Sequence, residues 1–175
     1  MEEGQADENF RGWIQSVGAG IEGYVTPKTA VGAVVGNERG ELLLTQRADT
    51  GEWFYPVGWA DVGYSPSEVA VKEVQEETGI EVVPRAVVAV VDGLRIGAII
   101  PFYSIVFRCE MVGGDLTAHP LETLDVGFFA EANLPSPLRA GGRWVAWAFA
   151  SLKDDDRPCY FDLPRTPMWR TPPDG

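Results

Sequence analysis

The sequence has little histidine and little cysteine. His119 is its single histidine, and Cys109 and Cys159 are its two cysteines, in 175 residues. Two cysteines make no disulfide framework, so we expect both thiols to be reduced. One histidine excludes a histidine-rich zinc site, and a histidine in a His-Pro turn is more often structural than catalytic. The patterns G-x-x-x-x-G-K-[ST] and G-x-S-x-G are also absent, so any chemistry must come from other residues.

Positive charge is scarce as well. Acidic residues outnumber basic ones 26 to 14, which gives a formal net charge of -12. A chain this acidic binds a phosphate backbone poorly, so we expect no nucleic acid duplex as a partner. If the protein binds a phosphate compound, a bound cation must supply the positive charge locally.

Long hydrophobic runs are missing too. The most apolar stretch, "AVVAVVDGLRIGAIIPFYSIVF", is interrupted by Asp92, Arg95 and Pro101, and the N-terminal "MEEGQADENF" has no apolar segment of a secretory signal. The sequence therefore predicts a cytoplasmic protein without a membrane partner.

Hydrophobic residues make up 45% of the chain, enough to form the core of one domain of this length. We predict an N-terminal extension over 1–27, a folded domain over 28–152 and a proline-rich tail over 153–175 that is irregular from Asp154 onward. Within the extension, "FRGWIQSV" has apolar residues at helical spacing. This short amphipathic helix would pack on the core or on a partner chain, which leaves a homodimer open.

The folded domain alternates between strand-like and helix-like segments. "TAVGAVVG" and "ELLLTQR" flank the turn "NERG" and predict a hairpin. Further extended segments are "EWFYPVGW", "RAVVAVVDG", "AIIPFYSIVFRCEM" and "TLDVGFFA", and "RWVAWAFASLK" reads as a long helix. With a second helix over 66–78, this order predicts an α/β (α+β) fold built around one mixed sheet.

The helix over 66–78 carries an unusual concentration of acid. Ser65 is a natural N-cap, Glu68 stands where a capping box needs its acid, and the helix should end near Gly79. At ~100° per residue, three carboxylates fall on one flank of this helix: Glu73, Glu76 and Glu77.

Carboxylates at these spacings supply the oxygen ligands that hard divalent cations such as Mg²⁺ prefer. A charge cluster on a helix is more often a solvated face, and the three acids alone favour that simpler interpretation. The preceding glycine-rich turn changes the balance.

Residues 58–80 resemble the Nudix box: Gly, five residues, Glu, seven residues, Arg-Glu, an apolar residue, any residue, Glu-Glu, any residue, Gly and an apolar residue. The sequence "GWADVGYSPSEVAVKEVQEETGI" keeps this spacing without a gap and matches seven of the nine defined positions. Tyr64 replaces the usual first Glu, and Lys72 replaces the usual Arg. The chain is thereby similar to Nudix hydrolases, and we expect the similarity to cover residues 28–152.

The resemblance implies an α/β/α sandwich with a mixed sheet and hydrolysis of a diphosphate bond in a nucleoside diphosphate linked to another group. It implies metal ligation of Mg²⁺, with Mn²⁺ as a substitute, by Glu73, Glu76, Glu77 and the carbonyl of Val57. Glu122, in the loop of "HPLETLDVGFF", is the best candidate for an additional metal ligand or general base. The alternative is that Glu122 is an exposed loop acid without a role in the site.

The segment "GWADVGYSPSE" is similar to a subgroup that acts on ADP-ribose or related compounds. Trp53, Phe54 and Tyr55 could stack on a base, although we expect at least two of them in the core. Because of Tyr64 and Lys72, a Nudix-fold module that binds a nucleotide without cleaving it stays an alternative to the enzyme.

Overall fold

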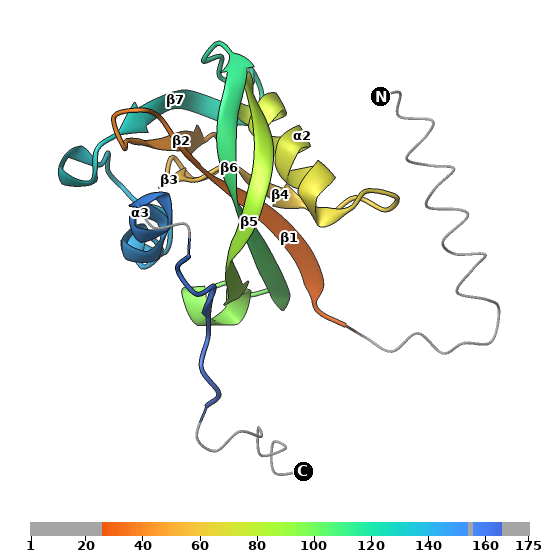
Figure 1. Ribbon diagram of the computed structural model, residues 1–175. Coiled ribbons are helices and arrows are strands. Elements are labelled where there is room, and N and C mark those ends of the chain that lie inside the picture. The colour runs from red at the N-terminus through yellow and green to blue at the C-terminus, as the bar shows by residue number, and fades with distance from the viewer. Residues whose placement is uncertain (1–25, 154–155, 166–175) are drawn as a thin grey trace, which may run out of the picture.

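The computed structural model describes residues 26–153 and 156–165 (Figure 1). The predicted N-terminal helix lies outside the described residues. The element bounds are β1 Lys28–Gly36, β2 Leu42–Arg47, β3 Trp53–Phe54, β4 Val57–Trp59, α2 Pro66–Thr78, β5 Ile80–Asp92, β6 Phe102–Gly114, β7 Thr123–Phe129, α3 Val145–Lys153 and β8 Tyr160–Phe161, with 3-10 turns η1 Gly93–Ile96, η2 Glu131–Asn133 and η3 Arg139–Gly142. Each segment predicted within the folded domain forms the expected type of element.

The strands form one mixed sheet in the order β3-β2-β1-β6-β5-β8, and β4 and β7 pair with β1 and β2. β1 runs parallel to β6, whereas it is antiparallel to β2 and β4. The predicted β1–β2 hairpin is confirmed. Its turn is fixed by the Asn37 side-chain oxygen, which accepts from the backbone N–H groups of Arg39 and Glu41 at 2.9 and 3.0 Å.

The helices α2 and α3 lie on different sides of the sheet, which gives the predicted three layers (Figure 1). The side chains of β1 alternate between them because successive residues of a strand face opposite ways. Val31, Ala33 and Val35 pack in the core beneath α2, and Val34 packs in the core beneath α3. Each core is therefore built from one face of the same sheet.

Near its N-terminal end, β1 lies between β4 and β6; near its C-terminal end, it pairs with β2 in place of β4. β2 and β4 therefore pair with opposite ends of β1. Tyr55, which lies between β3 and β4, packs against Gly32, where an added Cβ would overlap the tyrosine ring. This fork in the sheet opens the space in which the candidate site lies.

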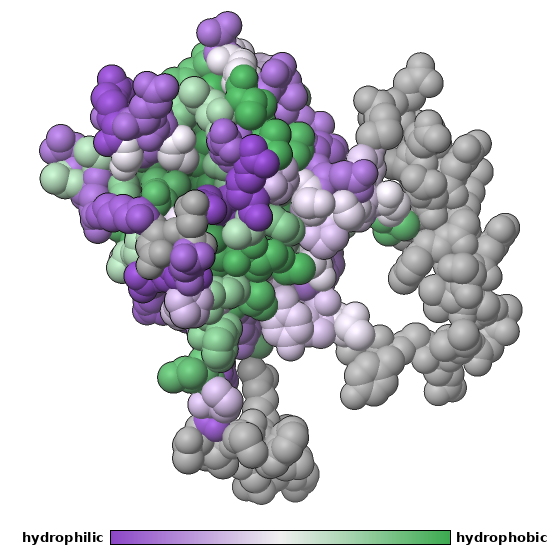
Figure 2. Space-filling model, in the orientation of Figure 1, coloured by the Kyte–Doolittle hydropathy of each residue, from purple (hydrophilic) through white to green (hydrophobic). Residues whose placement is uncertain are grey.

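The prediction of an irregular tail from Asp154 is wrong for two residues. Tyr160 and Phe161 form β8, parallel to β5 at Ala89 and Val90. The pairing covers part of the outer edge of β5, and unpaired strand edges readily accept another strand. Figure 2 shows hydrophobic surface along β5 and β6, and an exposed apolar side chain of β8, Phe161, adds to the apolar surface beside β5.

Among the described residues, the structure has no helix with the length and apolarity to cross a bilayer. Cys109 and Cys159 are free thiols, as predicted.

Candidate functional site

Both ends of helix α2 are fixed as the sequence predicts. Ser65 Oγ accepts from the N–H of Glu68 at 3.4 Å, and a carboxylate oxygen of Glu68 accepts from the N–H of Ser65 at 2.7 Å, which closes the capping box. Gly79 ends the helix with φ of 74°, a left-handed conformation that glycine adopts without strain. These caps fix where the helix begins and ends, and they thereby help to fix the direction in which its three acids point.

Glu73 lies against the strand β4 at its glycine. A Cβ added to Gly58 would overlap the carboxylate of Glu73, so the glycine of the box leaves room for this acid. The Glu73 side chain is only 12% exposed. Burial raises its pKa to about 7, with Lys72 acting in the opposite direction and neighbouring acids adding to the rise.

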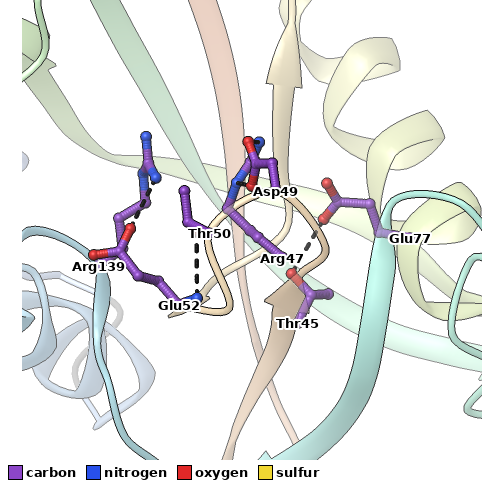
Figure 3. A network of polar contacts seen from close by, with 7 residues as sticks. All are labelled: Thr45, Arg47, Asp49, Thr50, Glu52, Glu77 and Arg139. Carbon is purple, nitrogen blue, oxygen red and sulfur yellow. Dashed lines mark hydrogen bonds and ion pairs between the residues drawn. The ribbon is translucent and has the colours of Figure 1, made fainter.

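Glu77 is more deeply buried and lies in the wall of the fork (Figure 3). Its carboxylate accepts from the backbone N–H of Val57 at 3.3 Å and from Thr45 Oγ1 at 3.5 Å. Burial, together with the charge of Glu73, raises its pKa to about 8. Burial and mutual repulsion disfavour the charged forms of these two carboxylates, so a cation bound between them would be strongly stabilising.

Lys72 places a positive charge beside this acidic flank. Its ammonium lies 3.1 Å from Asp61, 3.2 Å from Glu76 and 3.8 Å from Glu73. Burial alone would lower the pKa of Lys72, but these acids outweigh it and raise the pKa. The lysine thus takes the charge-pairing role expected of the usual arginine, without the planar fork of a guanidinium.

The three helix acids line one cavity of about 870 Å³, together with Val57, Gly58 and Glu122. Glu122 is exposed, as a loop acid would be, yet its charge adds to the rise in the pKa of Glu73 and Glu77. His119 helps to shape this loop, because its Nδ1 accepts from the N–H of Glu122 at 3.3 Å. The fold therefore brings the predicted site residues to one place; their roles stay predictions.

The cavity is also lined by two arginines that the sequence did not predict (Figure 3), and one of them, Arg47, lies close enough to Glu77 to lower the pKa of that acid. Arg47 holds Asp49 through two hydrogen bonds of 2.9 and 2.8 Å, and Arg139 binds Glu52 at 3.0 Å. Arg47 comes from the end of β2 and Arg139 from η3, far apart in sequence. No local pattern links them, so the sequence carries no signal for their meeting.

The chemistry of these residues fits a hard divalent cation. Carboxylate and carbonyl oxygens are the ligands that Mg²⁺ and Mn²⁺ take, and burial, which raises the pKa of two of the acids, leaves their charged forms poorly solvated without a cation. In the part of the chain that the structure describes, no three acidic, histidine or cysteine side chains converge on one point. Binding a cation would therefore need side-chain rotation, for example of Glu76, whose side chain is 53% exposed.

The structure also places the aromatic residues that the sequence singled out. Trp53, Phe54 and Tyr55 are all buried in the core beneath α3, as expected for at least two of them. Tyr64, where the box usually has Glu, is half-buried and packs against the core beneath α2. It does not line the cavity, so this departure leaves the acidic flank intact.

Comparisons with known proteins agree with this site. The model of the NUDIX domain family matches residues 26–149. The protein "Putative ADP-ribose pyrophosphatase YjhB" of Bacillus subtilis is 32% identical over 154 residues, which are 85% of this chain and 73% of that protein.

Two solved structures share the fold at appreciable identity. A crystal structure of an ADP-ribose pyrophosphatase from Streptococcus suis is 32% identical with a TM-score of 0.69, covering 78% of this chain and all of that one. A crystal structure of UDP-X diphosphatase is 26% identical with a TM-score of 0.71, covering 89% of this chain and 75% of that one. The family match over most of the chain and the helix acids that line the cavity lead to one conclusion: the chain belongs to the Nudix hydrolases and is a pyrophosphohydrolase.

Proposed function

We propose that the protein hydrolyses the diphosphate bridge of a nucleoside diphosphate linked to a second group, with an ADP-ribose-like compound as the favoured substrate. The observation that carries the proposal is that Glu73, Glu76, Glu77 and Glu122 all line one cavity. This cavity is large enough for a dinucleotide-sized molecule, since ligand pockets typically measure about 300–1,000 Å³. The names of the Bacillus and Streptococcus relatives support ADP-ribose as the first substrate to test.

A divalent cation, Mg²⁺ or Mn²⁺, would be held by the carboxylates of Glu73, Glu76 and Glu77 and by the Val57 carbonyl. It would polarise phosphoryl oxygens and lower the pKa of water. The protein positions the carboxylates: Gly58 leaves room for Glu73, and the Val57 N–H orients Glu77. Glu122 is the candidate to accept a proton from the attacking water, because it lines the same cavity from another element.

A substrate panel tests the proposal. ADP-ribose, NADH, nucleotide sugars, CDP-choline and nucleoside triphosphates should be assayed with Mg²⁺ and with Mn²⁺, each with and without excess chelator. We expect turnover of a diphosphate-bridged compound that stops with chelator and yields two phosphomonoesters without free orthophosphate. Direct orthophosphate release, or full turnover with chelator, would contradict the reaction class, and tight binding without turnover would favour a nucleotide-binding module.

A further inference from the structure

One wall of the cavity is a row of side chains on the sheet face opposite the carboxylate helix. Ala30 of β1 pairs with Trp59 of β4 on one side and with Ser104 of β6 on the other. Directly paired residues project from the same face of a sheet. Phe102, two residues before Ser104, shares this face. All four side chains line the cavity.

Ser104 is the buried polar group of this wall. It is 3% exposed, and its Oγ makes no hydrogen bond of ordinary geometry among the described residues, although it lies close enough to the Tyr55 hydroxyl to act on the pKa of that group. Buried hydroxyls are nearly always paired, because leaving one unpaired costs free energy. A buried, unpaired hydroxyl in the wall of a cavity indicates that a ligand supplies the missing partner.

Trp59 is the exposed aromatic residue of the same wall. Although 47% of it is exposed, the ring is held from two directions. Phe102 packs perpendicular to it, with ring centroids 5.3 Å apart, and the ammonium of Lys28 lies 5.3 Å from the centroid of the Trp59 ring. A rigid aromatic ring that is open to a cavity offers a flat surface for a planar ligand.

The position of this wall relative to the acids suits a nucleotide. Gly58, which contacts the Glu73 carboxylate, and Trp59 are successive residues of β4 and face opposite ways. Their Cα atoms are therefore only about 3.8 Å apart along the strand. One ligand that reaches around β4 can meet the acids and the aromatic wall together.

We propose that Trp59 and Ser104 form the subsite for the nucleobase, in which Trp59 stacks on the base and Ser104 Oγ makes a hydrogen bond with its edge. The assignment rests on the proposed function for the diphosphate at the acidic side. Phe102 and Lys28 position the Trp59 ring, and Ala30 leaves space above the sheet because its side chain is small.

The test compares ADP-ribose with its base-free counterpart, in which a diphosphate bridges two ribose groups. For ADP-ribose, Trp59→Ala should raise KM by about 5- to 100-fold with kcat nearly unchanged, the range expected when stacking on one base is lost. For the base-free compound, the same variant should behave like the wild type. Trp59→Phe should restore much of the lost affinity.

Tyr103→Ala is the matched control. Tyr103 is 51% exposed and adjacent to Phe102, but it lies on the other face of β6 and does not line the cavity. Its removal should leave both KM values unchanged. Ser104→Ala should raise KM for ADP-ribose by about 2- to 10-fold. Its melting temperature without ligand should fall little, because the hydroxyl makes no hydrogen bond of ordinary geometry there.

Equal KM values for the wild type and Trp59→Ala on ADP-ribose, or equal losses on both compounds, would overturn the subsite while leaving the proposed reaction intact. If the wild type hydrolyses nothing, equilibrium dialysis with AMP, GMP, CMP and UMP in chelator tests the subsite alone. Binding of at least one that Trp59→Ala weakens supports it. Binding of none, or equal binding by both proteins, refutes it.

Discussion

Glu77 and Glu68 lie on the same helix in opposite surroundings, so glutamine at each position should have opposite effects. Glu77 is buried beside Glu73, whereas the exposed Glu68 closes the capping box. Glutamine at 77 keeps an oxygen that can accept from Val57 but removes the charge. We expect Glu77→Gln to lower turnover by about 100-fold or more, because a charged metal ligand is lost. Glu68→Gln should leave turnover near normal, since glutamine also closes a capping box.

The stability effect of Glu77→Gln follows from the pKa of the acid that it replaces. A carboxyl whose pKa rises from 4.5 to about 8 on folding binds protons more tightly in the native state. In the metal-free protein, its contribution to stability is therefore largest below pH 4.5 and is lost as the pH rises toward 8. The full shift corresponds to roughly 5 kcal/mol at an isolated site. The charge of Glu73 causes part of this shift, so Glu77 is not an isolated site. We therefore expect Glu77→Gln to stabilise the protein at pH 8 by about half of the full value.

Melting temperatures in chelator at pH 5 and pH 8 measure this gain. At pH 8, Glu77→Gln should melt roughly 5–10 °C above the wild type, given about 2–4 °C per kcal/mol for a chain of this size. At pH 5 the difference should nearly vanish. Glu68→Gln should match the wild type at both values, and added Mg²⁺ should stabilise the wild type but not Glu77→Gln. A Glu77→Gln protein that is less stable at pH 8, or as active as the wild type, would refute the reasoning.

Three further substitutions test other parts of the site. Gly58→Ala should displace the Glu73 carboxylate and lower turnover by about 10-fold or more. Steady-state kinetics measure this loss, and an unchanged circular dichroism spectrum would show that the variant is folded. Unimpaired kinetics would contradict the prediction. Lys72→Arg should keep turnover within about threefold, because a guanidinium can hold Glu76 with two hydrogen bonds; a large loss in the same assay would show that the site is shaped for lysine. Gly79→Ala should destabilise the protein by about 1–2 kcal/mol or more, measured by urea unfolding, since alanine is strained at positive φ and its Cβ would overlap the Asp115 carbonyl; an unchanged unfolding midpoint would count against this account.

Much of the fold follows from local patterns in the sequence. Ser65, Glu68 and Gly79 bound α2 through contacts within a few residues, and the hairpin is set by the Asn37 turn. The spacing of the acids follows from the helix repeat alone. These predictions held because each depends on neighbours in the chain.

The sequence by itself determined the family, the acidic flank of α2 and its departures at Tyr64 and Lys72. It could not determine the neighbours that distant elements bring to that flank, namely Thr45 and Arg47 of β2 beside Glu77, or that Arg139 would line the same cavity. Nor could it show that Ser104 is buried without a hydrogen bond, or that Tyr160 and Phe161 would extend the sheet. Those features depend on which strands become neighbours, and the pairing of distant strands is set by packing of the whole domain.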